Sequence, residues 1–216
     1  MNEQQKKTLV ALSKNRMGVH FCETAAEIPA LVRSLLKKGD RVAVGGSVTL
    51  EQTGVLKMLY EPEYRMIDRY ETGITPAGKK QRFREAFFAD VFLTSSNAVT
   101  ESGELVNVDG NGNRVAAMMY GPDRVIVIVG SNKIVPTAQD GFRRIRRVAA
   151  PKNAERLNCR TYCREAGQCM ATATGMTAFT AGCLSPDRIC CQYTVMGRQR
   201  EEGRIQVILC GESLGY

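Results

Sequence analysis

Side chains suited to acid–base or nucleophilic chemistry follow a short apolar segment, Val-Phe-Leu-Thr at 91–94. Open α/β sheets bind their ligands beyond the carboxyl ends of such strands. Glu101 is therefore a candidate nucleophile or general base. The polar residues before it are candidates to bind substrate oxygens: Ser96, Asn97 and Thr100. The alternative is that these residues satisfy backbone groups of a loop while Glu101 is solvated.

A glycine turn follows an earlier apolar segment, 41–44. Gly45, Gly46 and Ser47 come directly after it. Glycines let the backbone approach a ligand, and a helix N-terminus offers free N–H groups to an anion. The turn lacks the lysine of a P-loop and the third glycine of a dinucleotide fingerprint. It predicts an anion-binding turn, with a plain tight turn and helix cap as the alternative.

Charged residues that could hold a hydroxylated anion lie in two further places. Asp109 and Arg114 flank a glycine-rich turn, and Lys133 follows the β-branched segment 124–130. Arginine and lysine donate charge-assisted hydrogen bonds to anions, and a carboxylate accepts one from a hydroxyl. Lys133 comes just after a predicted parallel strand. We therefore expect Lys133 and Glu101 to be catalytic and the other residues to bind ligand.

Cysteines are concentrated between residues 159 and 191, which hold six of the eight. In a protein that stays in a reducing compartment they are expected as thiols, metal ligands or catalytic groups. The candidate ligands for a zinc ion or an iron–sulfur cluster are Cys163, Cys169, Cys183 and Cys190, with Cys159 as a substitute. Their spacing is neither that of a zinc ribbon nor that of a ferredoxin, so free thiols are the alternative. Cys22 and Cys210 lie in apolar strands and are expected to be ordinary buried cysteines.

Alternating strands and helices are predicted to position these residues. The predicted strands are 19–22, 41–46, 66–68, 91–94, 124–130 and 204–210. The predicted helices are 3–17, 24–38, 47–59, 76–88 and 137–148. Repeated β-α-β units at this spacing predict an α/β fold with a mainly parallel sheet flanked by helices, to which 204–210 adds a strand.

Two segments depart from this alternation. The turn signal at 109–113 lies between two apolar runs and predicts a β-hairpin over 105–119, inserted in the α/β scheme. The cysteine-rich segment, 151–192, has little apolar content of its own. We expect it to be part of a single domain that spans 1–216.

Composition and charge limit the kinds of partner and cofactor that we expect for this protein. The 216 residues are 44% hydrophobic and 24% charged, as in globular proteins. The net charge of +8 fits an anionic partner such as a nucleotide, a phosphate ester, an acidic subunit or nucleic acid, and we expect a small anionic metabolite. The basic run 143–147 lacks interleaved aromatic residues, so a solvated helix face is expected rather than a nucleic-acid surface. No flavin or nicotinamide motif is present, and the oligomeric state, including a homo-oligomer, stays open.

The first residues and the longest apolar runs predict a cytoplasmic protein. The first residues, Met-Asn-Glu-Gln-Gln-Lys-Lys, lack the apolar core of a signal peptide. No apolar run approaches the ~20 residues that cross a bilayer, so no membrane partner is expected.

Several of these segments resemble the LUD domain family, the lactate-utilisation proteins, over 1–216. The resemblance is most specific at 89–94, at 100–103, at Arg114 and at 129–135. The run Ser-Pro-Asp-Arg-Ile-Cys at 185–190 is similar to the cysteine-bearing tail of stand-alone members. In those members two cysteines stand close before this run. In this chain, 13 residues from Met170 to Gly182 separate them.

The resemblance implies a fold like that of ribose-5-phosphate isomerase, glucosamine-6-phosphate deaminase and the CoA transferases. In that superfamily the early glycine turn binds phosphate or carboxylate, and the run 100–103 is similar to a CoA-transferase motif whose glutamate accepts an acyl group. It also implies a role beside iron–sulfur oxidoreductase subunits in oxidation of L-lactate to pyruvate. Two alternatives remain: a self-sufficient isomerase- or CoA-transferase-like enzyme that uses Glu101, and a non-catalytic module for assembly of a redox complex.

Overall fold

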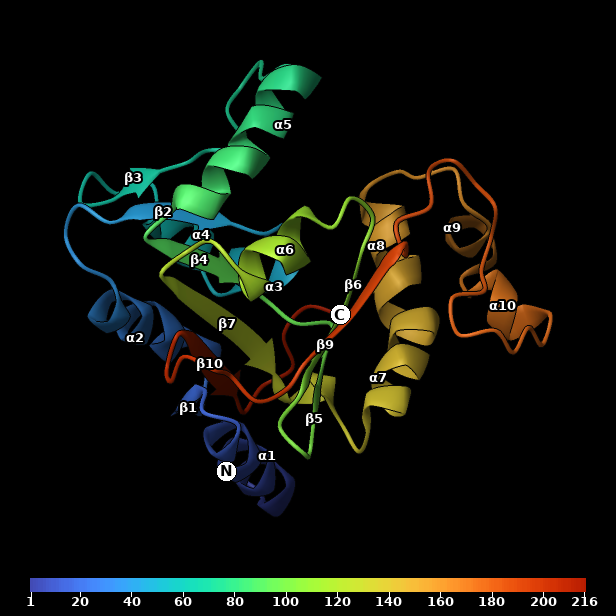
Figure 1. Ribbon diagram of the computed structural model, residues 1–216, viewed down its shortest axis with the longest axis horizontal. Coiled ribbons are helices and arrows are strands. Elements are labelled where there is room, and N and C mark those ends of the chain that lie inside the picture. Colours follow the sequence, from blue (N-terminus) through green and yellow to red (C-terminus); the bar gives the residue numbers. More distant parts are fainter.

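A six-stranded parallel sheet forms the centre of the molecule, which a computed structural model describes over residues 1–216 (Figure 1). Its strands in spatial order are β1 (Gly18–Cys22), β10 (Ile205–Cys210), β7 (Arg124–Gly130), β4 (Val91–Thr94), β2 (Arg41–Val44) and β3 (Arg65–Met66). All neighbours in this sheet are parallel. β-Branched runs that are buried on both faces suit such central strands. The predicted α/β fold is thus confirmed, including the strand near 204–210, which lies between β1 and β7.

A second, four-stranded sheet departs from the predicted hairpin. Its order is β8 (Ile134–Val135), β5 (Ala98–Thr100), β6 (Leu105–Asp109) and β9 (Gln192–Met196). The hairpin joins β5 to β6 through residues 101–104, and β6 also pairs antiparallel with β9.

The turn signal at 109–113 therefore does not reverse a strand, and that prediction is wrong. It starts helix α6 (Asn113–Met119) after Gly112, whose φ of +80° suits glycine. The Asp109 carboxylate accepts hydrogen bonds from the N–H groups of Arg114 and Val115. These N–H groups in the first turn have no partner inside the helix, so a carboxylate there stabilises the helix start.

The predicted helices are present with shifted ends. They are α1 (Glu3–Lys14), α2 (Ile28–Leu35), α3 (Val48–Gln52) with α4 (Val55–Met58), α5 (Pro76–Glu85), and α7 (Ala138–Arg144) with α8 (Ala150–Arg156). Two short helices of the cysteine-rich segment were not predicted: α9 (Tyr162–Ala166) and α10 (Met170–Ala173). Gly54, with φ of +72°, divides the helix predicted at 47–59. The helix predicted at 137–148 runs on through a π-helical turn, Ile145–Ala149, and past Pro151 to Arg156. Across the whole molecule, none of the helices combines the length and the apolar character needed to cross a membrane.

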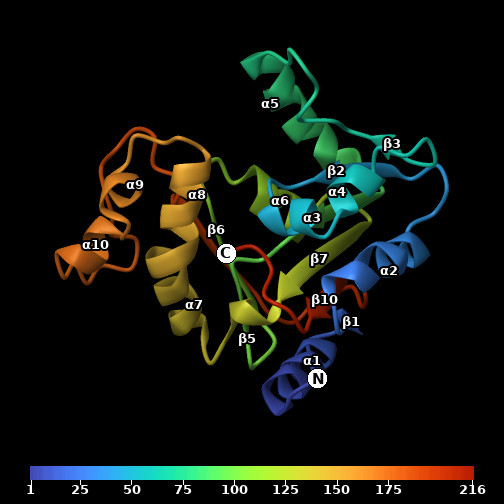
Figure 2. The same ribbon diagram turned by 180° about the vertical axis from the view of Figure 1, so that it is seen from behind.

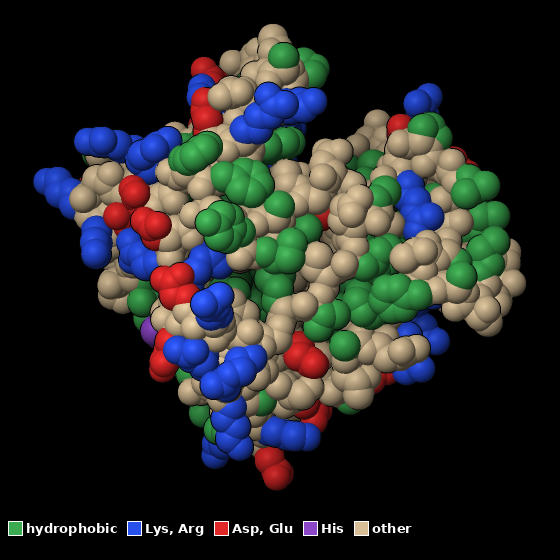
Figure 3. Space-filling view, viewed as in Figure 1, with side chains coloured by type: hydrophobic (Ala, Val, Ile, Leu, Met, Phe, Trp, Pro, Cys, Tyr) green, Lys and Arg blue, Asp and Glu red, His purple; other side chains and the backbone are tan.

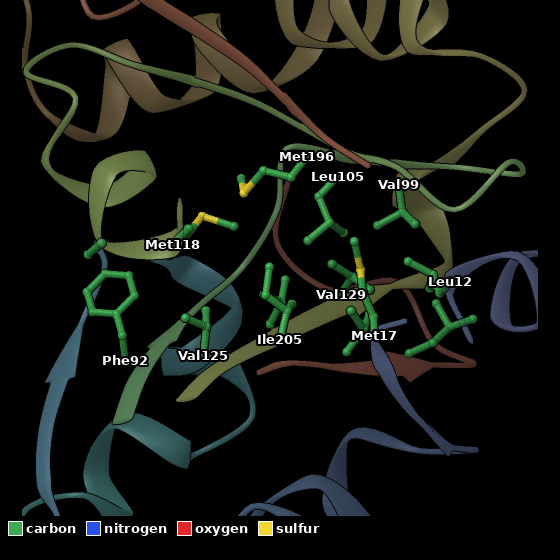
Figure 4. Packing of buried hydrophobic residues seen from close by; sticks show 14 of the residues in the cluster. Leu12, Met17, Phe92, Val99, Leu105, Met118, Val125, Val129, Met196 and Ile205 are labelled. Atoms are coloured by element: carbon green, nitrogen blue, oxygen red, sulfur yellow. The ribbon is translucent and has the colours of Figure 1, made fainter. Parts of the chain in front are cut away.

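The two sheets and the helices pack in layers. α2, α3 and α4 cover one face of the main sheet (Figure 2). The other face packs against α1, α6 and the second sheet, and Figure 4 shows Val125 and Ile205 of the main sheet facing Leu105 and Met196 of the second. The far face of the second sheet packs against α7. This arrangement brings the carboxyl ends of the parallel strands close to α8 and to one edge of the second sheet.

Candidate functional site

A cavity of about 200 Å³ lies at the carboxyl ends of β2, β4 and β7, where side chains from separate strands converge. α5, α6, α8 and residues 215–216 complete its walls. Figure 3 shows the surface hollowed between α5 and the side of the molecule that carries α8 and α9. The volume is below the ~300–1,000 Å³ of pockets for drug-sized ligands, so a smaller molecule fits it.

Lys133 is a buried lysine that lines the pocket. It follows β7, and its side chain is 2% exposed. Its Nζ donates hydrogen bonds to Ser95 Oγ at 2.8 Å and to Thr49 Oγ1 at 3.0 Å. Burial, reinforced by the positive charges of Arg144 and Arg114, lowers the pKa of Lys133 to about 7. A large fraction of this amine is therefore uncharged near neutral pH.

The run 143–147 was predicted to form a solvated helix face, and for Arg144 this prediction is wrong. Its guanidinium turns inward and donates to the carbonyl oxygens of Asn97 and Asn132. Burial lowers its pKa. Arg143 pairs with Asp140 on the outer surface, as a solvated face requires.

Two arginines of the pocket have no carboxylate partner. Arg69, just past β3, lies over the rings of Phe83 at 4.6 Å and Tyr70 at 5.3 Å, and its buried Nε has no hydrogen-bond partner. Arg156 of α8 is held by neutral groups. A Cβ on Gly46 would lie 3.6 Å from an Arg156 nitrogen and 3.8 and 3.9 Å from two Arg69 nitrogens, so both guanidinium groups face this turn. Burial lowers the pKa of Arg69.

Arg114 and Asp109 form the structural wall of the pocket. Arg114 Nε donates to Asp109 at 2.9 Å, and its four other N–H groups reach Ser95 O, Asn107 Oδ1, Asn97 Oδ1 and Val108 O. A guanidinium has five N–H donors, so every one has a protein acceptor. Arg114 therefore positions the strand ends around the pocket, and its donors are not free for a ligand.

Most of the predicted ligand-binding residues line this cavity together with Lys133: Gly46, Ser47, Ser96, Asn97, Asp109 and Arg114. Gly45 lies just beneath it. A Cβ at Gly45 would be 2.6 Å from Thr94 Oγ1 and 3.0 Å from Arg114 Cδ, so glycine is required for close packing there. Ser47 accepts a hydrogen bond from the N–H of Leu50 and caps α3.

Glu101 and Thr100 lie elsewhere. Glu101 is in the turn between β5 and β6, where it accepts hydrogen bonds from Lys7 at 2.7 Å and Gln4 at 2.9 Å. These two groups on α1 hold the pKa of Glu101 below its usual range. Thr100 donates to Glu104 at 2.7 Å. The structure therefore separates Glu101 from Lys133, the other residue predicted to be catalytic.

Several pocket residues were not predicted as a site: Thr49, Arg69, Ser95, Asn153, Arg156 and Tyr216. Arg69 and Ser95 each follow a predicted strand, and that position was a usable signal. Arg156 and Tyr216 come from a helix and from the last residues of the sequence. Only tertiary packing brings them to the pocket, where Arg156 Nε donates to Tyr216 Oη at 2.9 Å.

The four predicted metal ligands occupy one region of the cysteine-rich segment. Cys163 lies in α9, Cys169 precedes α10, and Cys183 and Cys190 lie in the chain that returns to β9. Burial raises the pKa of Cys163 and of Cys190, and Cys169 and Cys183 raise both further, so the four are electrostatic neighbours. Arg188 donates to Cys190 Sγ at 3.3 Å.

Soft thiolate donors suit zinc or an iron–sulfur cluster. Even so, no group of three or more His, Cys, Asp or Glu side chains is positioned to hold an ion. Two thiols can shift each other's pKa at distances longer than those that a shared metal ion allows, so the positions of the sulfur atoms are the stricter test of a metal site. The four thiols are close neighbours that are not arranged to hold an ion in this structure, and their role as metal ligands stays a prediction. Cys22 and Cys210 are buried and adjacent across β1 and β10, which confirms the prediction for them.

Known proteins of similar sequence and structure identify the family of this chain. No curated protein matches the chain. The crystal structure of a DUF162 family protein from Deinococcus radiodurans aligns over 97% of each chain, with 17% identity and a TM-score of 0.51. A weaker match is eIF2B beta from Chaetomium thermophilum, with 15% identity, a TM-score of 0.36, and 52% of this chain and 43% of that chain covered. Another is eIF-2B from Pyrococcus horikoshii, with 16% identity, a TM-score of 0.35, and 53% of this chain and 48% of that chain covered. A sequence model of the LUD domain matches residues 6–210. The chain belongs to the LUD domain family, as its motifs predicted.

Proposed function

We propose that the pocket binds a small carboxylated or phosphorylated metabolite. One observation carries this proposal: Arg69, Arg156 and Lys133 face one cavity whose only acidic side chain, Asp109, is already paired with Arg114. Partly buried cations without counter-ions are unfavourable until an anion enters, so the pocket attracts one. The proposal needs neither Glu101 nor the thiols.

The walls divide the pocket into two ends of different chemistry. Arg69 and Arg156 flank Gly46, where no Cβ blocks the approach of an anionic group. The other end offers Lys133 with the hydroxyl groups of Thr49 and Ser95. A metabolite with a carboxylate or phosphate at one end and an oxygen function at the other matches both.

A role in a lactate-utilisation-like oxidation system is consistent with this chemistry. L-Lactate and pyruvate are small carboxylates with an oxygen function on the next carbon, and the family is linked to their interconversion. The sequence carries no flavin or nicotinamide motif, so we assign electron transfer in such a system to partner subunits. The separate position of Glu101 makes a CoA-transferase-like reaction through this residue the weaker proposal.

Calorimetric titration tests the proposal with four probes: L-lactate, pyruvate, ribose 5-phosphate and inorganic phosphate. We expect at least one to bind, and Arg69→Met and Arg156→Met each to weaken that binding ~10-fold or more, because a hydrogen bond to a charged group contributes ~1.5–3 kcal/mol. Arg147→Met is the matched control, because Arg147 is exposed and outside the pocket. Binding that is unchanged in both pocket variants, or no binding of any probe, would refute the proposal.

A further inference from the structure

We propose that Lys133 forms an imine with the carbonyl carbon of an anionic ketone or aldehyde bound in this pocket. The inference rests on the proposed function, because the anionic group of the ligand is what the arginines hold. It adds a covalent step and restricts the ligand class to carbonyl compounds. The buried amine, rather than Glu101, is then the reacting group of the site.

The surroundings of Lys133 are those of a nucleophile rather than of a structural ion pair. A buried lysine that serves structure is normally paired with a carboxylate, because an isolated buried charge is strongly unfavourable. The Nζ of Lys133 instead donates only to Thr49 Oγ1 and Ser95 Oγ. The side chain is almost fully buried and yet lines the cavity. Its amine is thus shielded from bulk water and open to a ligand.

The backbone of Gly215 closes one side of this amine. A Cβ on Gly215 would lie 3.3 Å from Lys133 Nζ and 2.6 Å from Thr49 Oγ1, and its φ is +57°. The N–H of Gly215 donates to Gln52 Oε1 at 2.7 Å, which fixes this backbone in place. A side chain at 215 would clash with Thr49 and crowd the amine, so this backbone occupies one side of Lys133 Nζ and a ligand approaches from the cavity.

The charges of the site keep the amine reactive. Imine formation requires an unprotonated amine, and the pKa of about 7 leaves a substantial share of the Lys133 side chains uncharged near neutral pH. Arg69 and Arg156 would neutralise the anionic end of the ligand at the Gly46 turn. The positive charges of Arg144 and Arg114 continue to oppose protonation of Lys133.

The reaction needs no reagent other than one proton from water. The Nζ lone pair attacks the carbonyl carbon, the carbon–nitrogen bond forms, and the carbonyl π electrons move to oxygen, which takes up the proton released by nitrogen. The hydroxyl group of the carbinolamine then takes up a proton from water and leaves as water, which gives a protonated imine. Ser95 and Thr49, in hydrogen-bond contact with Nζ, are placed to relay these protons. No electrons enter or leave, so no oxidant is needed.

Reductive trapping tests this step. The full chain is incubated with pyruvate or with dihydroxyacetone phosphate in the presence of sodium cyanoborohydride, and the product is examined by intact mass and peptide mapping. We expect one reduced ligand per chain, on Lys133, with more labelling at pH 8 than at pH 6. The two probes distinguish a carboxylate from a phosphate as the anionic group. Excess inorganic phosphate or L-lactate, which have no carbonyl group, should suppress the labelling.

Lys133→Met should abolish the labelling, and Lys152→Met, which alters an exposed lysine of α8 outside the pocket, should not. Calorimetry on the same samples separates the two proposals. Binding of a carbonyl probe without labelling of Lys133, or labelling spread over exposed lysines, overturns the imine and leaves the proposed function standing. Absence of any anion binding overturns both. Suppression by L-lactate or inorganic phosphate needs no variant, so a misfolded Lys133→Met protein would not prevent the test.

Discussion

Replacing Lys133 by methionine should make the protein more stable at neutral pH and should change how its stability depends on pH. Methionine has nearly the shape of the lysine stem but carries no charge. The folded state of the natural chain disfavours the protonated amine because it is buried without a carboxylate. The variant therefore removes an unfavourable contribution at the expense of two hydrogen bonds to Thr49 and Ser95.

The pKa of Lys133 sets the magnitude. Lowering it from 10.5 to about 7 disfavours the folded state by ~5 kcal/mol below pH 7, at ~1.4 kcal/mol for each tenfold change in the dissociation constant. Loss of two hydrogen bonds offsets this by ~2 kcal/mol, so the expected net gain at pH 7 is ~2–3 kcal/mol. Between pH 7 and 10.5 the unfolded chain binds a proton at Lys133 that the folded chain does not. Raising the pH therefore removes the disadvantage of the natural protein, by ~2 kcal/mol between pH 7 and 9.

Urea unfolding, followed by circular dichroism at pH 6, 7 and 9, measures this. The difference in free energy of unfolding between Lys133→Met and the natural chain should be largest at pH 6 and 7 and should shrink at pH 9. Lys152→Met, an exposed change in α8, should track the natural chain at every pH. A difference between Lys133→Met and the natural chain that stays constant from pH 6 to 9 would show that Lys133 has an ordinary pKa.

Three further predictions concern the turn, the β5–β6 loop and the thiols. Gly45→Ala should reduce the free energy of unfolding in urea by ~1–3 kcal/mol, because its methyl group would meet Thr94 at 2.6 Å. At Gly46 only the ends of arginine side chains lie near, beyond 3.5 Å, so Gly46→Ala should unfold like the natural chain. It should bind anions more weakly in calorimetry. Glu101→Gln should leave ligand affinity and Lys133 trapping unchanged, and a tenfold loss of either would return this carboxylate to the mechanism. Added Zn²⁺ should protect the four neighbouring thiols from alkylation by iodoacetamide, with exposed Cys191 as the internal reference, and equal labelling with and without the ion would contradict the ligand set.

The main sheet was predictable because its signals are local. Runs of β-branched residues such as 124–130 favour buried strands wherever they occur in an α/β chain, and the capping box at 24–27 is complete within four residues. The hairpin predicted at 105–119 was wrong because a turn signal does not specify whether a strand or a helix comes after the turn. The Asp109 carboxylate reaches the N–H groups of 114 and 115 and starts a helix there.

The candidate site was predictable where it is built from strand ends. Gly46, Asn97 and Lys133 follow strands that pair in parallel, so the sheet brings them to one edge. Arg156 and Tyr216 lie outside that rule, because their place depends on how α8 and residues 215–216 pack over the edge. A short motif also does not specify where its side chains point. The β5–β6 turn places Glu101 against α1 and away from the cavity.

The position of β10 in the middle of the main sheet has a consequence for how the chain assembles. β1 has no neighbour in this sheet other than β10, so residues 18–22 cannot pair until residues 205–210 have been made. Closing a loop of nearly the whole chain is a slow step, and strand pairs of this kind lower folding rates. During synthesis from the N-terminus, β1 therefore stays unpaired for longest. A chain cut short before residue 205 would leave β1 unpaired and β7 with an open edge, both ready to pair with other molecules.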